Sequence, residues 1–181
     1  MVDEVDLRSL MRQASAGQPD AWEVLYRRAY PRLFSYARRR LPSDDAADDA
    51  VSEAMVRALD RASSFTWRGA GVDAWLYGIL RNVVLESHRT TPTQPQADPA
   101  DDRVPGPLDD IVGREQLGHV RVAFAALDAE DREILELRVV GGLTAQAAGE
   151  VLGRRSGAVR MAQSRAVGRL RTHFQEVTGG G

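Results

Sequence analysis

Apolar residues recur every three to four positions through most of this chain, which is the period of an amphipathic helix. The first such stretch runs from Asp20 to Leu41, and Asp20 and Glu23 have capping-box spacing at its start. Pro31 lies inside the stretch and removes a backbone hydrogen bond, so we expect a kink or a break into two helices there. Almost no segment alternates apolar and polar residues, and the sequence therefore predicts an all-α protein.

The same period predicts further helices, over Ser43–Ala62, Val72–His88, Arg114–Ala126, Asp128–Val139, Thr144–Leu152 and Ser156–Phe174. Ser43 is a candidate N-cap, and Gly141, Gly142 and Gly153 supply turns. The Ser- and Gly-rich loop 63–71 is unusual because it carries two aromatic side chains, Phe65 and Trp67.

The segment from Thr90 to Gly113 holds five of the eight prolines and few large apolar residues, so it cannot bury enough surface to fold alone. Proline and like charges extend such a segment, which would hold two flanking units apart while letting them reorient. We therefore divide the chain into an N-terminal unit (1–89), a flexible Pro- and Asp-rich linker (90–113), a C-terminal unit (114–175) and a tail (176–181).

Composition limits the functional classes. The 181 residues, of which 43% are hydrophobic, suffice for two small helical cores. No run approaches the roughly 20 apolar residues that span a bilayer, and Asp3, Glu4 and Asp6 stand where a signal peptide would be basic. We therefore expect a cytoplasmic protein with no membrane insertion. The absence of cysteine excludes disulfides, thiolate zinc sites and a cysteine nucleophile.

Basic charge is concentrated near the C-terminus, where a helix-turn-helix is predicted from Leu143 to Phe174. Its second helix can turn Val159, Ala166, Val167, Leu170 and Phe174 to the core. Its outward positions near the N-terminus, which would enter a DNA major groove, are Arg160, Met161, Gln163, Ser164 and Arg165. The phosphate contacts would come from Arg154, Arg155, Arg169 and Arg171, together with backbone amides at the helix start near Ser156 and Gly157. The alternative is a solvated basic helix on an ordinary bundle.

Two separate stretches resemble the ECF-type sigma factors of bacterial RNA polymerase. The segment Leu127–Leu170 resembles region 4 of that family, and its sequence is LDAEDREILELRVVGGLTAQAAGEVLGRRSGAVRMAQSRAVGRL. Three further segments resemble region 2 of the family, namely Trp22–Arg40 (WEVLYRRAYPRLFSYARRR), Asp44–Leu59 (DDAADDAVSEAMVRAL) and Trp75–Arg89 (WLYGILRNVVLESHR). The family's region 3 is absent. Arg155 stands where the family often has proline, and Met161-Ala162-Gln163 replaces a commoner Ser-Arg-Leu.

The resemblance implies contacts with core RNA polymerase and with promoter DNA. An acidic helix would dock onto the polymerase through Asp48, Asp49, Ser52, Glu53, Val56 and Arg57. The alternative is that these side chains form an ordinary solvated surface. The -10 site would be lined by Trp67, Arg68, Gly69, Ala70 and Gly71, with Arg81, Asn82 and Arg89 near the backbone of the separated strand. Trp75 and Tyr77 are assigned to the core. The -35 element would be read as duplex by Arg160, Met161 and Ser164, with Arg165 nearby.

The resemblance also implies an anti-sigma partner, and no cofactor, metal or catalytic centre in this chain. The first alternative function is an enzyme. The sequence argues against it, because His88, His119 and His173 are far apart and do not indicate a shared catalytic or metal-binding site. A self-sufficient helix-turn-helix repressor is the stronger rival, since its C-terminal half would look the same. The region 2 resemblance separates the two.

Overall fold

The structure is a computed structural model that describes residues 4–67, 69–90 and 114–179. The N-terminal unit contains α1 (Glu4–Ser15), α2 (Pro19–Arg38), α3 (Asp44–Arg61), the short 3-10 helix η1 (Ala62–Ser64) and α4 (Gly71–Thr90). The C-terminal unit contains α5 (Arg114–Ala125), α6 (Ala129–Leu135), the π-helical segment η2 (Glu136–Val140), α7 (Ala145–Leu152) and α8 (Ser156–Gly179). No described residue forms a strand, so the all-α prediction is confirmed. The predicted linker lies almost wholly outside the described residues.

The start of α2 differs from the prediction. The N-cap is Gln18, without a side-chain hydrogen bond, and Pro19 opens the helix, so the capping box at Asp20 does not form. Pro31 does not break α2, which continues to Arg38. The proline itself is exposed, whereas Ala29 and Leu33 on either side are buried. Tertiary packing of these neighbours stabilises the helix across the missing hydrogen bond.

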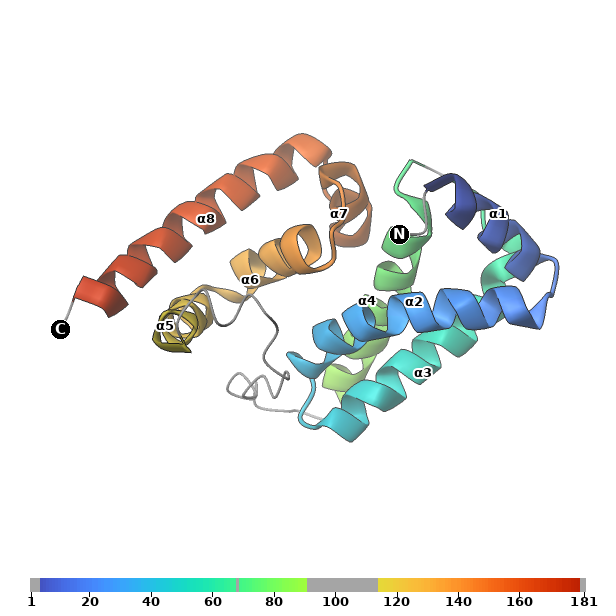
Figure 1. The fold of residues 1–181 in the computed structure, drawn as a ribbon, viewed down its shortest axis with the longest axis horizontal. Helices are drawn as coiled ribbons and strands as arrows, with labels where there is room; N and C mark the ends of the chain where they lie inside the picture. Colours follow the sequence, from blue (N-terminus) through green and yellow to red (C-terminus); the bar gives the residue numbers. More distant parts are fainter. Residues whose placement is uncertain (1–3, 68, 91–113, 180–181) are drawn as a thin grey trace.

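The remaining helices of the N-terminal unit follow the expected apolar stripes. The Ser43 hydroxyl accepts from the backbone N–H of Ala46 at 3.1 Å, which confirms Ser43 as the N-cap of α3. The helix α1 was not predicted. Its buried residues Leu7, Met11 and Ala14 lie on one face and join the core, and α1 packs beside α2 and η1 (Figure 1).

The helix-turn-helix forms as predicted, and α7 and α8 meet closely around a buried glycine. Thr144 caps α7, the turn passes through Gly153, and α8 starts at Ser156. A Cβ placed on Gly149 would lie 2.5 Å from the backbone oxygen of Arg154, so the turn into α8 can approach α7 this closely only because Gly149 has no side chain. The helix α8 continues beyond Phe174 to Gly179.

Replacing Gly149 by Ala is therefore expected to destabilise the protein by about 1 to 3 kcal/mol, the usual cost of overpacking against backbone that cannot move freely. Gly168 on α8 offers a matched control because a Cβ there meets no atom within 4 Å. Gly168→Ala should instead stabilise by about 0.5 to 1 kcal/mol, from helix propensity alone. Thermal unfolding followed by circular dichroism measures both, and equal shifts in the two variants would contradict the close approach.

The two units pack directly against each other, contrary to the expectation that the linker holds them apart. Figure 1 shows α7 beside α4, and buried residues of both helices belong to one continuous hydrophobic core. A second, smaller cluster of Leu127, Leu135 and Ala166 lies wholly within the C-terminal unit. The core of the molecule therefore crosses the boundary between the predicted domains.

Candidate nucleic-acid interface

The first turns of α8 present a polar face to solvent. Val159, Ala162 and Ala166 are buried against the rest of the C-terminal unit, and this fixes the rotation of the helix. The opposite positions are exposed, namely Arg155, Arg160, Met161, Ser164 and Arg165. Met161 is 65% exposed, which is unusual for a large apolar side chain without a partner. An exposed row of Arg, Ser and Met at the second helix of a helix-turn-helix can supply both hydrogen bonds and an apolar contact to base edges.

Three of the predicted -35 contacts have partners within the protein. Arg154 Nη1 lies 2.6 Å from Glu130, and Gln163 accepts a hydrogen bond from Arg138 Nε at 2.8 Å. Arg169 pairs through two nitrogens with Asp131, whose side chain is only 3% exposed. The partners lie on α6 and η2, far away in sequence, so helical periodicity gave no signal for them.

One expected core position on α8 lies at the surface. Val167 is 39% exposed, and it lines an apolar groove of about 370 Å³ together with Val120 and Leu170. The shape of the C-terminal unit therefore leaves an apolar strip beside the recognition helix.

An aromatic cluster holds the loop before α4. The rings of Phe65 and Trp67 are perpendicular with centroids 6.0 Å apart, and Phe65 lies 4.8 Å from Trp75. The guanidinium of Arg8 lies 4.7 Å from the centre of the Trp67 ring, a cation–π contact from α1. Gly71 adopts φ +71°, and its backbone passes beside the Trp67 ring. Arg68 lies outside the described residues.

The three residues predicted to lie near the backbone of the separated DNA strand are distributed along α4. Asn82 and Arg89 are exposed, whereas Arg81 Nε lies 3.0 Å from Oε1 of Glu133 in the C-terminal unit. Asn82 also lines a cleft of about 480 Å³ between the Phe65 loop and α7. Tyr77 is buried, as assigned, and burial raises its pKa to about 12; Trp75 is half-buried.

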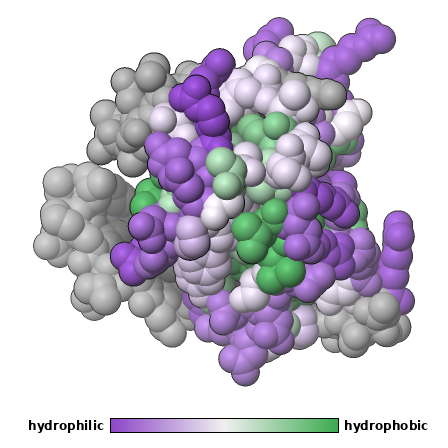
Figure 2. Space-filling view, turned by 90° about the vertical axis from the view of Figure 1, so that its right-hand side faces the viewer, coloured by the Kyte–Doolittle hydropathy of each residue, from purple (hydrophilic) through white to green (hydrophobic). Residues whose placement is uncertain are grey.

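The acidic face of α3 is exposed along its length. The side chains of Asp48, Asp49, Ser52, Glu53 and Val56 all face solvent. Val56 is 55% exposed, and Leu59 is 48% exposed one turn further along. The surface seen from the α1–α3 side is otherwise mostly hydrophilic, with only small hydrophobic areas (Figure 2).

Hydrogen bonds fix the polar groups around this face. The Tyr30 hydroxyl donates to Asp48 at 2.7 Å, and this hydrogen bond raises the pKa of Tyr30 to about 12, so it remains a donor at neutral pH. Arg57 bridges Glu53 at 2.7 Å and Glu86 at 2.8 Å. The result is a preorganised row of carboxylates and two apolar side chains, which suits contact with a partner helix.

The described residues contain neither a candidate metal site nor a candidate membrane span. Among them no set of three or more His, Cys, Asp or Glu side chains is placed to hold a metal ion. Within the same ranges, each helix is too short or too polar to cross a membrane.

Comparisons with known proteins agree with this arrangement. Residues 25–91 match the model of Sigma-70 region 2, and residues 123–172 match that of Sigma-70 region 4. The chain is 30% identical over 177 residues to the ECF RNA polymerase sigma factor SigD of Mycobacterium tuberculosis, covering 91% of this chain and 82% of SigD. It is 32% identical to ShbA of Streptomyces griseus, covering 90% and 92%. BldN of Streptomyces coelicolor is 28% identical, and the match covers 91% of this chain but only 64% of BldN.

A solved structure shares the overall arrangement. CnrH, in complex with the cytosolic domain of CnrY, superposes with a TM-score of 0.68 at 25% identity, covering 93% of this chain and 97% of CnrH. The chain thus belongs to the ECF RNA polymerase sigma factors, a family of transcription initiation factors.

Proposed function

We propose that this chain binds core RNA polymerase through the exposed face of α3 and directs it to promoters. The loop at Trp67 and the start of α4 would hold the -10 element during strand opening. The first turns of α8 would read the -35 element as duplex. The observation that carries the proposal is the exposed carboxylate row with Val56 and Leu59 in the same chain as the helix-turn-helix. A self-sufficient repressor has no need of that second surface.

The chemistry of RNA synthesis would belong to the polymerase and its own magnesium, so we assign no catalytic centre, cofactor or metal to this chain. The site of action would be the cytoplasm, where the polymerase works. An anti-sigma protein would hold the chain inactive by covering α3 and the DNA surfaces. CnrH, which shares the fold, was solved with the cytosolic domain of CnrY, and this supports the proposal.

Run-off transcription with purified core polymerase tests the proposed function. The template is a library of promoters, and the reaction is run with and without this protein. We expect promoter-dependent transcripts only when the protein is present. A competent core that gives no such transcript with the added protein would refute the proposal.

Arg160 and Arg169 should respond differently to truncation. Arg160 is exposed at the groove-facing end of α8, so Arg160→Ala should relax the preference at one -35 base pair by about 1 to 3 kcal/mol. Arg169 was predicted to contact phosphate, but its pairing with the buried Asp131 gives it a structural role as well. Arg169→Ala should therefore lower the Tm, because Asp131 is left buried without its ion-pair partner.

Binding to a library of -35 duplexes, together with thermal unfolding, separates the two effects. A uniform loss of affinity with an unchanged sequence preference in Arg160→Ala would contradict base recognition by that side chain. An unchanged Tm in Arg169→Ala would leave phosphate contact as its role.

A further inference from the structure

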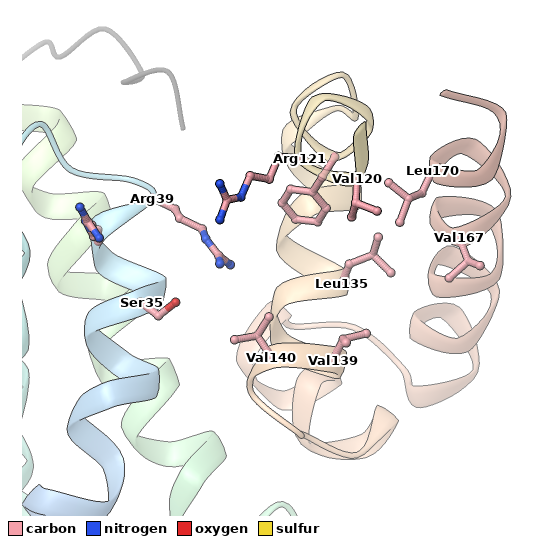
Figure 3. A pocket seen from close by; sticks show the side chains of 11 residues that line it. Ser35, Arg39, Val120, Arg121, Leu135, Val139, Val140, Val167 and Leu170 are labelled. Atoms are coloured by element: carbon pink, nitrogen blue, oxygen red, sulfur yellow. The ribbon is translucent and has the colours of Figure 1, made fainter. Parts of the chain in front are cut away.

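The apolar groove of about 370 Å³ lies between α2 and the C-terminal unit. Figure 3 shows Ser35 and Arg39 of α2 on one side of it and the apolar side chains of α5, α6, η2 and α8 on the other. Sites for small molecules enclose about 300 to 1,000 Å³, so the groove has the size of such a site. No residue that lines it has been assigned to polymerase or to DNA.

The groove is walled by valines that water reaches. Val120, Val139, Val140 and Val167 all line it, and Val139 is 67% exposed. Apolar side chains gathered at one place on the surface mark a site that a ligand or partner covers.

The apolar path is elongated. A second hollow of about 250 Å³ shares Val120, Val167 and Leu170 with the groove and reaches Phe174, one turn further along α8. Its lining is also predominantly apolar, with the stem of Arg171 as the remaining wall. Two adjoining hollows of this shape suit an unbranched alkyl chain better than a compact ring.

Positive charge gathers at the opposite end of the groove. Three arginines and no acidic side chain line it, namely Arg38, Arg39 and Arg121. Figure 3 shows Arg39 and Arg121 pointing into the space between α2 and α5, whereas Val167 and Leu170 lie on the far side. Two guanidinium groups that face each other repel, and an anion between them removes that repulsion. The groove is therefore apolar along its length and cationic at one end.

The ion pairs of α2 leave Arg39 able to bind a further carboxylate. Glu136 is 5% exposed and lies 2.5 Å from Arg40 Nη1, whereas its other oxygen lies 3.5 Å from Arg39 Nη1. Charge-assisted hydrogen bonds have lengths of about 2.7 to 2.9 Å, so the contact with Arg39 is a long one. Arg40 therefore compensates the buried charge of Glu136 when Arg39 turns to a ligand.

We propose that this groove is a binding site for an amphipathic anion, a free carboxylate on an unbranched alkyl chain. Arg39 and Arg121 bind the carboxylate, for which the planar guanidinium is well suited. The chain lies along the exposed valines and continues toward Phe174. The inference goes beyond the proposed function, because it assigns a small-molecule ligand to a surface that the proposed function does not use.

Decanoate, kept below its micellar concentration, tests the site on the unmodified chain. Calorimetric titration should show saturable binding, and decanoate should raise the Tm because it binds the folded state. Octanoate should bind roughly tenfold more weakly, since two fewer methylenes are buried. Decyltrimethylammonium has a tail of the same length and the opposite charge, and should bind about tenfold more weakly or less well still. Decanoate that does not saturate, or that binds no better than the cation, would overturn the proposal.

Removing the two arginine charges locates the carboxylate. Arg39→Gln/Arg121→Gln should weaken decanoate binding about tenfold, the loss expected for charge-assisted hydrogen bonds. Arg12→Gln/Arg27→Gln makes the same change in net charge at two exposed positions of α1 and α2 that do not line the groove. Equal losses in the two double variants would mean that only net charge matters, and would overturn the assignment of Arg39 and Arg121.

A carboxylate placed in the wall locates the alkyl chain. Val139→Asp puts a charge in the groove and should weaken decanoate binding about tenfold, because that charge is desolvated and repels the ligand. Val122→Asp is the matched control, since Val122 is 56% exposed and does not line the groove. Circular dichroism checks that every variant keeps its helices. Decanoate affinity that falls equally in the two variants, or in neither, would overturn the placement of the ligand.

Discussion

Replacing Val56 by Asp is expected to weaken binding to core polymerase, and with it polymerase-dependent transcription, while leaving the fold intact. Val56 is 55% exposed in the middle of the α3 face, so the substitution removes no buried contact. In a helix-on-helix interface the same side chain would be desolvated, and a carboxylate there would lie unpaired. Loss at such a central position costs about 2 kcal/mol or more, which is roughly a thirtyfold fall in affinity.

A matched control is available on the other unit. Val122 on α5 is 56% exposed, so Val122→Asp makes the same chemical change at a site outside the α3 face. Affinity for core polymerase is measured by labelled-protein titration, and helix content by circular dichroism. Similar affinities of the two variants for the polymerase would contradict docking through α3.

Replacing Trp67 by Ala is expected to impair strand opening far more than duplex binding. Stacking of a base on an aromatic ring is worth about 1 to 3 kcal/mol, so run-off from a duplex promoter should fall roughly five- to 150-fold. Trp67→Phe keeps an aromatic face and should retain much of the activity. Trp67 itself lies in a surface loop, where it contacts Phe65 and Arg8 of α1, so helix content should not change.

A template with the -10 segment already unpaired provides the decisive comparison. On it the cost of unstacking has been removed, so Trp67→Ala should recover part of the lost transcription. Equal defects on paired and unpaired templates would argue against a role for Trp67 in strand opening.

The local features of this fold were predictable because they depend on neighbours in sequence. Helical periodicity located α3, α4, α7 and α8, and the hydroxyl of Ser43 marked the start of α3 correctly. Pro31 does not break α2, because the packing of Ala29 and Leu33 stabilises the helix around it, and the local sequence does not reveal that packing. The helix α1 was not predicted, although its buried residues Leu7, Met11 and Ala14 have helical spacing.

The site was predicted less completely, because the tertiary structure determines which charged side chains form ion pairs with each other. Exposure of Arg160, Met161 and the α3 carboxylates follows from the helical period and agrees with the prediction. Nothing local indicates that Arg81 meets Glu133 or that Arg169 meets Asp131. An Arg in a basic stretch looks equally suited to a phosphate and to a carboxylate until the fold brings one of them near.

The contact between Arg8 and Trp67 bears on how this protein can be divided or recombined. The matched region 2 segment begins at residue 25, so the helix that supplies Arg8 lies outside it. A chimaera that borrows only residues 25–91 would inherit the Trp67 loop without the cation that covers its ring. Exchanges of promoter specificity between relatives should therefore carry α1 along with the loop it supports.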